Sequence, residues 1–181
     1  YSQLLQDDSN LTKDQQESLR TINKSGEHLL DLINDILDMS KIEAGRITLK
    51  PVNFDFIELL KEVEQLFKIK AIQKNLELSF QLTLGVPKNI FADESRVKQV
   101  IINLLGNALK FTTNGFVHVL IENIDNETMK VCVKDSGSGI LKEEHEVIFK
   151  PFEQSQKGGQ VREGTGLGLA ISKKFANLMG G

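Results

Sequence analysis

The stretch Asp93–Thr112, DESRVKQVIINLLGNALKFT, is predicted to form one helix with two unlike faces. Asp93 suits the position before its first turn, because a short acidic side chain accepts hydrogen bonds from the free N–H groups there. One face is a broad apolar stripe at helical spacing, which is typical of a helix that packs on a core. The stripe consists of Val97, Val100, Ile101, Leu104, Leu105, Ala108 and Phe111.

The opposite face carries side chains that suit a metal ion and phosphate. Asn103 and Asn107 stand one helical turn apart, so their Cβ atoms should lie about 5–6 Å from each other. Lys110 follows on the same side. Mg²⁺ prefers oxygen ligands and is commonly held by a few protein groups together with nucleotide phosphates. On this stretch alone, a solvated face rich in asparagine and lysine explains the pattern equally well.

The composition is that of a soluble globular protein of 181 residues, 40% of them hydrophobic and 26% charged, with a net charge of −3. The sequence has no cluster of basic residues, so we do not expect nucleic acid as a partner. No apolar run reaches the ~20 residues that cross a bilayer, so we expect membrane contact only through parts outside this chain. A single cysteine, Cys132, excludes an internal disulfide and favours a reducing, cytoplasmic compartment. Both ends fall close to predicted helices, which predicts a piece of a longer protein.

Residues 1–45 are predicted to be the remnant of a helical hairpin: the end of a first helix, a loop and a long second helix. Thr12 and Gln15 form a capping-box pattern at the start of the second helix, and Gly45 suits the position after its end. The helix carries a heptad-like apolar seam formed by Leu19, Ile22, Gly26, Leu29, Ile33 and Ile36. The seam predicts a homodimer in which two hairpins form a four-helix bundle. Packing on the chain's own globular domain is the alternative.

Residues 46–181 are predicted to form an α+β domain, a two-layer sandwich with a mixed sheet and its helices on one face. We expect a strand at Arg46–Lys50, where the apolar period changes, and a helix at about Phe56–Lys74 that Asp55 caps. The expected inward residues of this helix are Ile57, Leu60, Val63, Leu66, Phe67 and Ile69. Further strands are expected at Leu76–Leu82, Ile90–Ala92, Gly115–Glu122 and Thr128–Lys134.

The last of these strands leads into Asp135–Ile140, DSGSGI. A carboxylate beside two glycines provides an acceptor next to a backbone that a flat ring can approach closely. Adenine fits such a place, with its exocyclic amine donating to Asp135 and its ring lying on Gly137 and Gly139. A plain turn that contains glycine is the simpler interpretation of this stretch alone.

A second glycine-rich segment, Gly164–Gly168, GTGLG, opens a predicted helix. Free N–H groups at the positive end of a helix favour phosphate. The spacing is neither that of a P-loop nor that of a dinucleotide-binding fingerprint. Phe149 and Phe152 precede a polar loop, Ser155–Glu163, which is predicted to be either a lid over a ligand or an ordinary surface loop.

In this order, the motifs N-x-x-x-N-A-x-K-F, D-x-G-x-G-I, F-x-x-F and G-T-G-L-G-L resemble the ATP-binding domain of sensor histidine kinases, a branch of the superfamily shared with gyrase, HSP90 and MutL. The resemblance covers residues 46–181. The preceding S-G-E-H-L-L-D-L-I-N-D-I-L-D-M-S-K-I-E-A-G is similar to the second helix of the dimerisation and phosphoacceptor hairpin, especially in hybrid kinases. The family implies ATP and Mg²⁺ as ligands, and the receiver domain of a response regulator as a partner.

The resemblance also implies a role for each motif residue. Asn107 is implied to ligate Mg²⁺ with Asn103 beside it, and Lys110 to contact phosphate. Asp135 is implied to bind the adenine amine. The remaining implied nucleotide-binding residues are Gly137, Gly139, Ile140, Phe149, Phe152, Gly164, Thr165, Gly166, Leu167 and Gly168.

One position departs from the family pattern. Many members have an arginine that reaches the γ-phosphate two residues after the second phenylalanine, where this chain has Gln154. Either Gln154 or Arg162 is left to take that role.

The implied activity is phosphoryl transfer from Mg·ATP to a histidine and then to an aspartate of a response regulator. The family's acceptor histidine precedes an acidic residue and an Arg-Thr-Pro-like stretch, and none of His28, His118 and His145 has this context. We therefore expect the chain to lack the acceptor helix, and to bind nucleotide without phosphorylating itself.

Two other functions stay open. An ATP hydrolase of the same superfamily places a glutamate, which activates water, where this chain has Asn103, and an amide cannot act as that base. A non-catalytic module for dimerisation and nucleotide sensing would keep the apolar seam, but it has no need of a complete set of metal and adenine residues.

Overall fold

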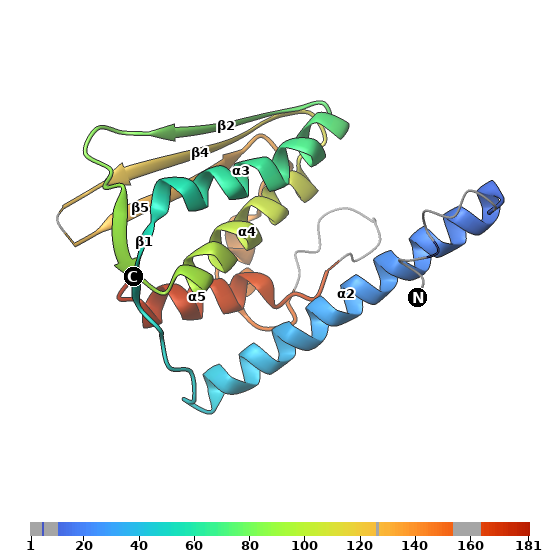
Figure 1. The fold of residues 1–181 in the computed structure, drawn as a ribbon. Coiled ribbons are helices and arrows are strands. Elements are labelled where there is room, and N and C mark those ends of the chain that lie inside the picture. Colours follow the sequence, from blue (N-terminus) through green and yellow to red (C-terminus); the bar gives the residue numbers. More distant parts are fainter. Residues whose placement is uncertain (1–4, 6–10, 126, 154–163) are drawn as a thin grey trace. The chain divides into compact units, whose positions relative to one another are not determined.

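The computed structural model describes residue 5 and residues 11–125, 127–153 and 164–181 (Figure 1). The chain divides into two compact units, residues 1–47 and 48–181. The boundary expected near Gly45 lies close to this division. The described part of the first unit is built on one long helix, and the second unit combines helices with β-strands.

Helix α2 (Lys13–Glu43) begins as the capping-box pattern predicts. Gln15 N donates to Thr12 Oγ1 at 3.3 Å, and Thr12 N donates to Gln15 Oε1 at 2.9 Å. These bonds satisfy N–H groups that the open end of a helix leaves without partners. After Ala44, the C-cap, Gly45 adopts a φ of 62°, the left-handed conformation that glycine reaches most easily. Both predicted ends of this helix are confirmed.

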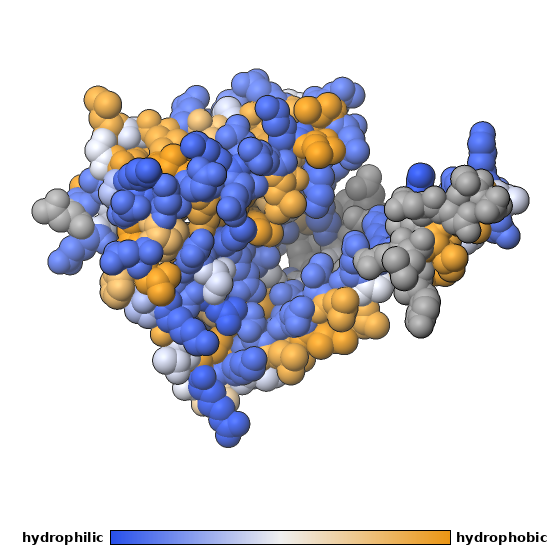
Figure 2. All heavy atoms as spheres, in the orientation of Figure 1, coloured by the Kyte–Doolittle hydropathy of each residue, from blue (hydrophilic) through white to orange (hydrophobic). Residues whose placement is uncertain are grey.

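The apolar seam of α2 is exposed along much of its length. The large apolar side chains between 39% and 61% exposed are Ile22, Leu29, Leu30, Ile33, Ile36 and Leu37. Figure 2 shows apolar side chains gathered along this helix. An apolar row of this kind is typical of a surface that another element covers. Neither α2 nor any other helix in the described ranges is long and apolar enough to cross a membrane.

The second unit is an α+β fold with a mixed sheet, as predicted. Its elements are β1 (Val52–Asp55), α3 (Phe56–Gln73), β2 (Leu76–Leu82), β3 (Asn89–Ala92), α4 (Glu94–Phe111), β4 (Gly115–Asn123), β5 (Met129–Asp135), the 3-10 helices η1 (Lys142–Glu144) and η2 (Val147–Phe149), and α5 (Gly168–Leu178). Strand β4 pairs with β2 in parallel and with β5 antiparallel, while β1 and β3 form a separate antiparallel pair. Helices α3, α4 and α5 lie on one side of the main sheet (Figure 1).

The core lies between these helices and the inner face of the sheet. Alternate residues of β4, namely Val117, Val119 and Ile121, are fully buried, as the period of a strand requires. The buried helical residues that meet this core are Phe56, Leu59, Leu60, Val63, Phe67, Ala71, Ile101, Leu105, Ala108 and Leu109. Because α4 buries this stripe, Asn103 and Asn107 lie on the opposite side of the helix.

Strands β2, β4 and β5 share one end of the main sheet. The parallel strands β2 and β4 begin side by side, with Leu76 opposite Gly115. Strand β5 ends there, with Asp135 opposite Val117. Because α3 and α4 lead directly into β2 and β4, the last turns of both helices lie near the end of β5.

The strand predicted at Arg46–Lys50 is wrong. Residues 46–51 have no regular secondary structure, and β1 begins only at Val52. Lys50 N donates to the side chain of Asp93 at 2.9 Å instead of to a neighbouring strand, and Pro51 has no N–H to donate. The alternating pattern of these residues was therefore not sufficient to form a ladder.

Some predicted inward positions on the helices are also wrong. Leu66 and Ile69 of α3 are 51% and 65% exposed, and Phe111 at the end of α4 is 56% exposed, whereas Leu109 is buried. Both helices carry apolar residues on more than one face. Their spacing alone therefore does not say which face meets the sheet.

Asp93 caps α4 as predicted. Its carboxylate accepts from Arg96 N at 3.2 Å, from Ser95 Oγ at 2.7 Å and from Lys50 N at 2.9 Å. Burial raises the pKa of Asp93, but the hydrogen bonds from Lys50, Ser95 and Arg96 outweigh burial and hold the pKa below its usual value. The ionised carboxylate thus joins the segment before β1 to the start of α4.

Candidate functional site

Asn103 joins the polar side of α4 to the start of α5. Its Nδ2 donates to Gly168 O and to Ser172 Oγ, both at 3.3 Å. A backbone carbonyl can only accept, so the amide nitrogen faces α5, and Oδ1 is the atom able to bind a cation. Gly168 lies close to this amide, because a Cβ there would be 3.5 Å from Asn103 Cγ. The spacing of motifs along the sequence does not reveal this contact.

Asn107 and Lys110 lie further along the same side of α4. Both are half-buried, and the side chain of Asn107 forms no hydrogen bond within the described part of the chain. Lys110 Nζ lies beside Gly164, since a Cβ at Gly164 would be 3.1 Å from it. The ammonium group of Lys110 therefore lies beside the second glycine-rich segment.

The turn after β5 packs against the C-terminal end of α4. Gly137 approaches Phe111 O so closely that an added Cβ would lie 2.5 Å from this oxygen. Asp135 Oδ1 accepts from Gly137 N at 2.8 Å, which orients the carboxylate at the start of the turn. Ser136 Oγ accepts from Phe116 N at 2.9 Å. The turn is thus fixed to both α4 and β4.

Phe111 belongs to this site and not to the core, contrary to the sequence prediction. Its ring is 56% exposed, and its centre lies 4.9 Å from Lys110 Nζ. Its carbonyl oxygen packs against Gly137, so the backbone of Phe111 lies beside the Asp135 turn. The signal in the sequence was Thr112, which takes the buried position at the end of the stripe and donates from Oγ1 to Ala108 O at 2.7 Å.

The start of α5 is an open helix terminus. Leu167 is the N-cap residue, it is fully buried, and no side chain caps this end among the described residues. Leu167 N donates to Thr165 Oγ1 at 3.1 Å. First-turn N–H groups have no partner inside a helix, and together with the helix dipole they favour an anion.

The backbone connects the segment before the predicted lid to the glycine-rich segment after it. Phe152 N donates to Gly166 O at 3.1 Å, and a Cβ at Gly166 would lie 2.9 Å from the Phe152 carbonyl carbon. Gly166 has a φ of 71° and Phe152 a φ of 65°. The Phe152 ring is 67% exposed, whereas Lys173 Nζ lies 4.9 Å from the centre of the Phe149 ring. The backbone of Phe152, and not its ring, makes this connection.

The remaining predicted site residues either have few described contacts or lie outside the described residues. Gly139 has a φ of 66°, and apart from its chain neighbours no described atom lies within 4 Å of an added Cβ there. Ile140 is 45% exposed. The predicted lid, Ser155–Glu163, lies outside the described residues, as do Gln154 and Arg162.

The α4 donors fit Mg²⁺ that is held jointly with a nucleotide. Asn103 Oδ1 and the Asn107 amide are neutral oxygen donors on one side of one helix, and the Lys110 ammonium and the α5 terminus lie nearby for phosphate. Mg²⁺ takes about six oxygen ligands, so phosphate and water would supply the ligands beyond these two amides.

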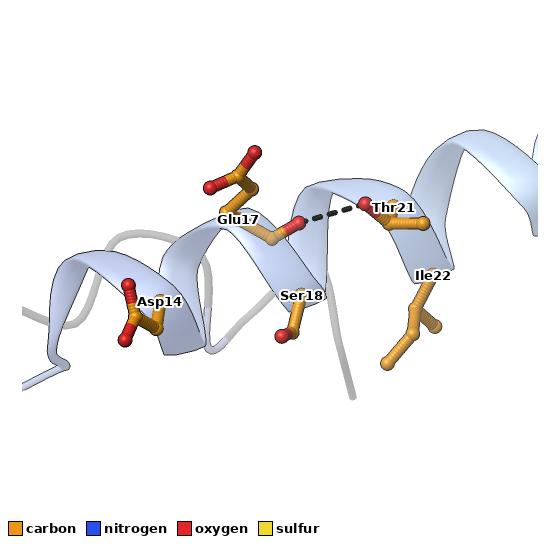
Figure 3. Close-up of a pocket in the computed structure, with 5 residues that line it drawn as sticks. All are labelled: Asp14, Glu17, Ser18, Thr21 and Ile22. Carbon is orange, nitrogen blue, oxygen red and sulfur yellow. Dashed lines mark hydrogen bonds between the residues drawn. The ribbon is translucent and has the colours of Figure 1, made fainter.

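A separate open hollow lies on α2 (Figure 3). Its lining residues are Asp14, Glu17, Ser18, Thr21 and Ile22. Thr21 Oγ1 donates to Glu17 O at 2.9 Å within the helix. The lining side chains that the structure describes all belong to α2.

Known protein families match both parts of the chain. Residues 92–181 match the family described as Histidine kinase-, DNA gyrase B-, and HSP90-like ATPase, and residues 1–45 match the His Kinase A (phospho-acceptor) domain. The signal transduction histidine-protein kinase BarA of Escherichia coli (strain K12) is 40% identical over 176 residues, which cover 94% of this chain and 19% of BarA.

Solved structures agree with these matches. The catalytic domain of the histidine kinase ThkA is 34% identical with a TM-score of 0.60, covering 70% of this chain and 79% of that domain. Full-length ShkA in complex with AMPPNP is 34% identical with a TM-score of 0.80, covering 99% of this chain and 37% of ShkA. ThkA in complex with the response regulator protein TrrA is 31% identical with a TM-score of 0.62, covering 82% of this chain and 42% of that chain.

The fold and these matches place residues 92–181 in the class of histidine kinase-like ATPase domains, and residues 1–45 in the class of phospho-acceptor domains. The chain belongs to the histidine kinase family, and the resemblance drawn from its motifs is confirmed. It spans about a fifth of the length of the curated relatives BarA and ArcB.

Proposed function

We propose that this chain is the ATP-binding kinase core of a two-component sensor histidine kinase. The γ-phosphoryl group of ATP passes to a histidine on the first hairpin helix, and then to an aspartate of a response regulator. The observation that carries the proposal is that one helix, α4, contacts the Asp135 turn at its end and the Gly164–Gly168 segment along its polar side.

The adenine end of the proposed site is the Asp135 turn. Asp135 is exposed, and its Oδ1 is held by Gly137 N. In this proposal its second oxygen accepts a hydrogen bond from the exocyclic amine of adenine. Phe111, beside this turn, offers a flat apolar surface to an aromatic base. We include Gly139 and Ile140 in this end of the site because they continue the same turn.

The phosphate end is the side of α4 that faces α5. In this proposal Asn103 and Asn107 hold Mg²⁺ through their amide oxygens, and the bound ion supplies neutralisation of phosphate charge. Lys110 and the backbone N–H groups in the first turn of α5, which begins at Gly168, contact the phosphates. The bond from the γ-phosphorus to ADP breaks as a bond to an imidazole nitrogen forms, so positioning and charge neutralisation are the main requirements.

The lid is proposed to be Ser155–Glu163, which lies between Phe152 and Gly164 in the sequence. The hydrogen bond from Phe152 N to Gly166 O supports this proposal, because it holds the two sides of the segment together. We include in the lid's attachment the residues that precede and follow it, namely Phe149, Thr165 and Leu167.

The proposed partners follow from the first unit and from the relatives. The exposed seam of α2 and the match of residues 1–45 to the phosphoacceptor domain support a homodimer through the hairpin. The ThkA–TrrA complex supports a receiver domain as the phosphate acceptor. We assign residues 1–45 to the hairpin and 46–181 to the ATP-binding domain. The unpaired Cys132 and the use of ATP support a cytoplasmic location.

The hydrolase alternative has no comparable support. A water-activating base must accept a proton, and the amide of Asn103, with its nitrogen directed at Gly168 O, cannot do so. The non-catalytic alternative is separated by joining the chain to a first hairpin helix with its histidine. Formation of acid-labile phosphohistidine from ATP supports the kinase, and its absence with tight ATP binding supports the sensing module.

Titration of the chain with Mg·ATP tests the site. Asn107→Ala and Asp135→Ala should each weaken binding by about tenfold to a hundredfold, as expected when a hydrogen bond or ligand to a charged group is lost. Asn177→Ala and Asp31→Ala, at exposed positions elsewhere, should bind as the unaltered chain does. Undiminished affinity in both site variants would contradict the proposal.

A further inference from the structure

Lys74 lies where α3, α4 and β2 meet, and no nucleotide-binding motif includes it. It is the C-cap residue of α3, and the next residue, Asn75, has a φ of 55° that turns the chain into β2. Lys74 Nζ donates to Leu109 O at 2.6 Å and lies 3.5 Å from Lys110 O. These oxygens belong to the last turn of α4, where a helix leaves its carbonyls without N–H partners.

The other two carbonyl oxygens of this turn also have close neighbours. Ala108 O accepts from Thr112 N at 3.1 Å and from Thr112 Oγ1 at 2.7 Å. Phe111 O lies against Gly137. Lys74 contacts the remaining two carbonyl oxygens, those of Leu109 and Lys110. Its positive charge also interacts favourably with the negative end of the helix dipole. One side chain from α3 thus completes the C-terminal end of α4.

The same turn of α4 presents the side chains proposed to meet the nucleotide. Lys110 reaches toward Gly164 from it, and Phe111 contacts Gly137 through its carbonyl. A small rotation of this turn would move both groups relative to the Asp135 turn. The position of the turn therefore matters for binding as well as for folding.

We infer that Lys74 is a positioning residue of the nucleotide site, which holds the last turn of α4 against the Asp135 turn through Leu109 O. This inference rests on the proposed function, because it concerns the same site. A cap that serves stability alone would lower the melting temperature without a matching effect on nucleotide affinity.

The test compares affinity for Mg·ATP with thermal stability in the 181-residue chain. Lys74→Met keeps the aliphatic stem and removes the donor, and it should weaken Mg·ATP binding by about tenfold, as expected for loss of a hydrogen bond from a charged group. Lys74→Arg, which keeps a cationic donor, should restore most of the affinity. Lys68→Met removes an exposed lysine from the same helix and should change nothing.

A matched destabilised variant separates positioning from folding. Val63 of α3 is fully buried in the core, so Val63→Ala should lower the melting temperature while leaving Mg·ATP affinity unchanged at a temperature where the chain is folded. Lys74→Met that binds as tightly as the unaltered chain, or that loses no more affinity than Val63→Ala, overturns the inference.

The controls also separate this inference from the proposed function. If the unaltered chain does not bind Mg·ATP, both fail. If it binds, and Asn107→Ala weakens binding while Lys74→Met does not, only the inference about Lys74 fails. If Lys74→Met does not fold, Lys74→Leu, which also removes the donor, replaces it under the same expectations.

Discussion

Gly137 is a residue at which two segments of the site pack closely. An ideal Cβ there would lie 2.5 Å from Phe111 O and 2.8 Å from Asp135 Oδ1. Gly106, inside α4, is the opposite case, because nothing lies within 4 Å of its added Cβ. The two glycines therefore differ in what they contribute: close approach of two segments at Gly137, and only added backbone freedom at Gly106.

This difference predicts opposite effects on stability. Gly137→Ala should lower the free energy of unfolding by about 1–3 kcal/mol, because the methyl group must displace backbone and carboxylate atoms. Gly106→Ala should raise it by about 0.5–1 kcal/mol, as expected in a helix interior. Urea unfolding of both variants measures these changes. A Gly137→Ala variant as stable as the unaltered chain would contradict the described contact with Phe111.

Single residues also show how far sequence patterns reach. The spacing of Asn103, Asn107 and Lys110 predicted one polar side of α4, and the structure has it. The partner of Asn103 could not be predicted, because Gly168 lies 65 positions away along the chain. Phe111 was assigned to the core because the helical period includes it, whereas Thr112 takes the buried position at the end of the helix.

At the scale of elements, local signals were the most reliable. Helix caps at Thr12, Asp55 and Asp93 were predicted correctly, because a cap depends on residues within one turn of itself. The strand expected at Arg46–Lys50 failed, and so did part of the inward face of α3. Both depend on which neighbour the element meets, and that is decided by tertiary packing and not by local period.

Asp93 gives a prediction about pH at this scale. Its pKa is lowered in the folded state, so its ionised form stabilises the fold above the unfolded pKa of about 3.9, and this stabilisation is lost as pH falls through the folded pKa. Asp93→Asn keeps a capping side chain and removes the charge. The variant should be less stable than the unaltered chain at about pH 7, and the difference should shrink at about pH 3.

Urea unfolding at both pH values measures this difference. Asp31→Asn, at an exposed position inside α2, serves as the control for charge removal. A stability difference for Asp93→Asn that stays constant, or grows, as pH falls would show that the carboxylate does not act as described.

At the scale of the whole molecule, the described contacts of the candidate site all lie in residues 48–181. The order of motifs along the chain was sufficient to predict the family, and the periodicity of the chain was sufficient to predict an α+β fold. Neither was sufficient to predict that α4 would contact both glycine-rich segments. The contact with the Asp135 turn arises because β4 begins where β5 ends. The contact with the second segment is made by the side chains of Asn103 and Lys110.

The division into units predicts that a fragment of residues 48–181 binds Mg·ATP about as tightly as the whole chain. The site contacts that the structure describes are formed within residues 48–181, so removal of residues 1–47 should leave them in place. Calorimetric titration of both proteins measures this. A loss of affinity of more than about tenfold, equivalent to about 1.4 kcal/mol, would show that the first unit contributes to binding.

The most direct test of a single site formed around α4 is an amide NMR titration of the isotope-labelled chain with Mg·AMPPNP. The account predicts that signals of Asn107–Phe111, Asp135–Gly139 and Gly166–Gly168 shift together and follow one binding curve. Shifts confined to one of these segments, or segments that saturate at different ligand concentrations, would contradict it.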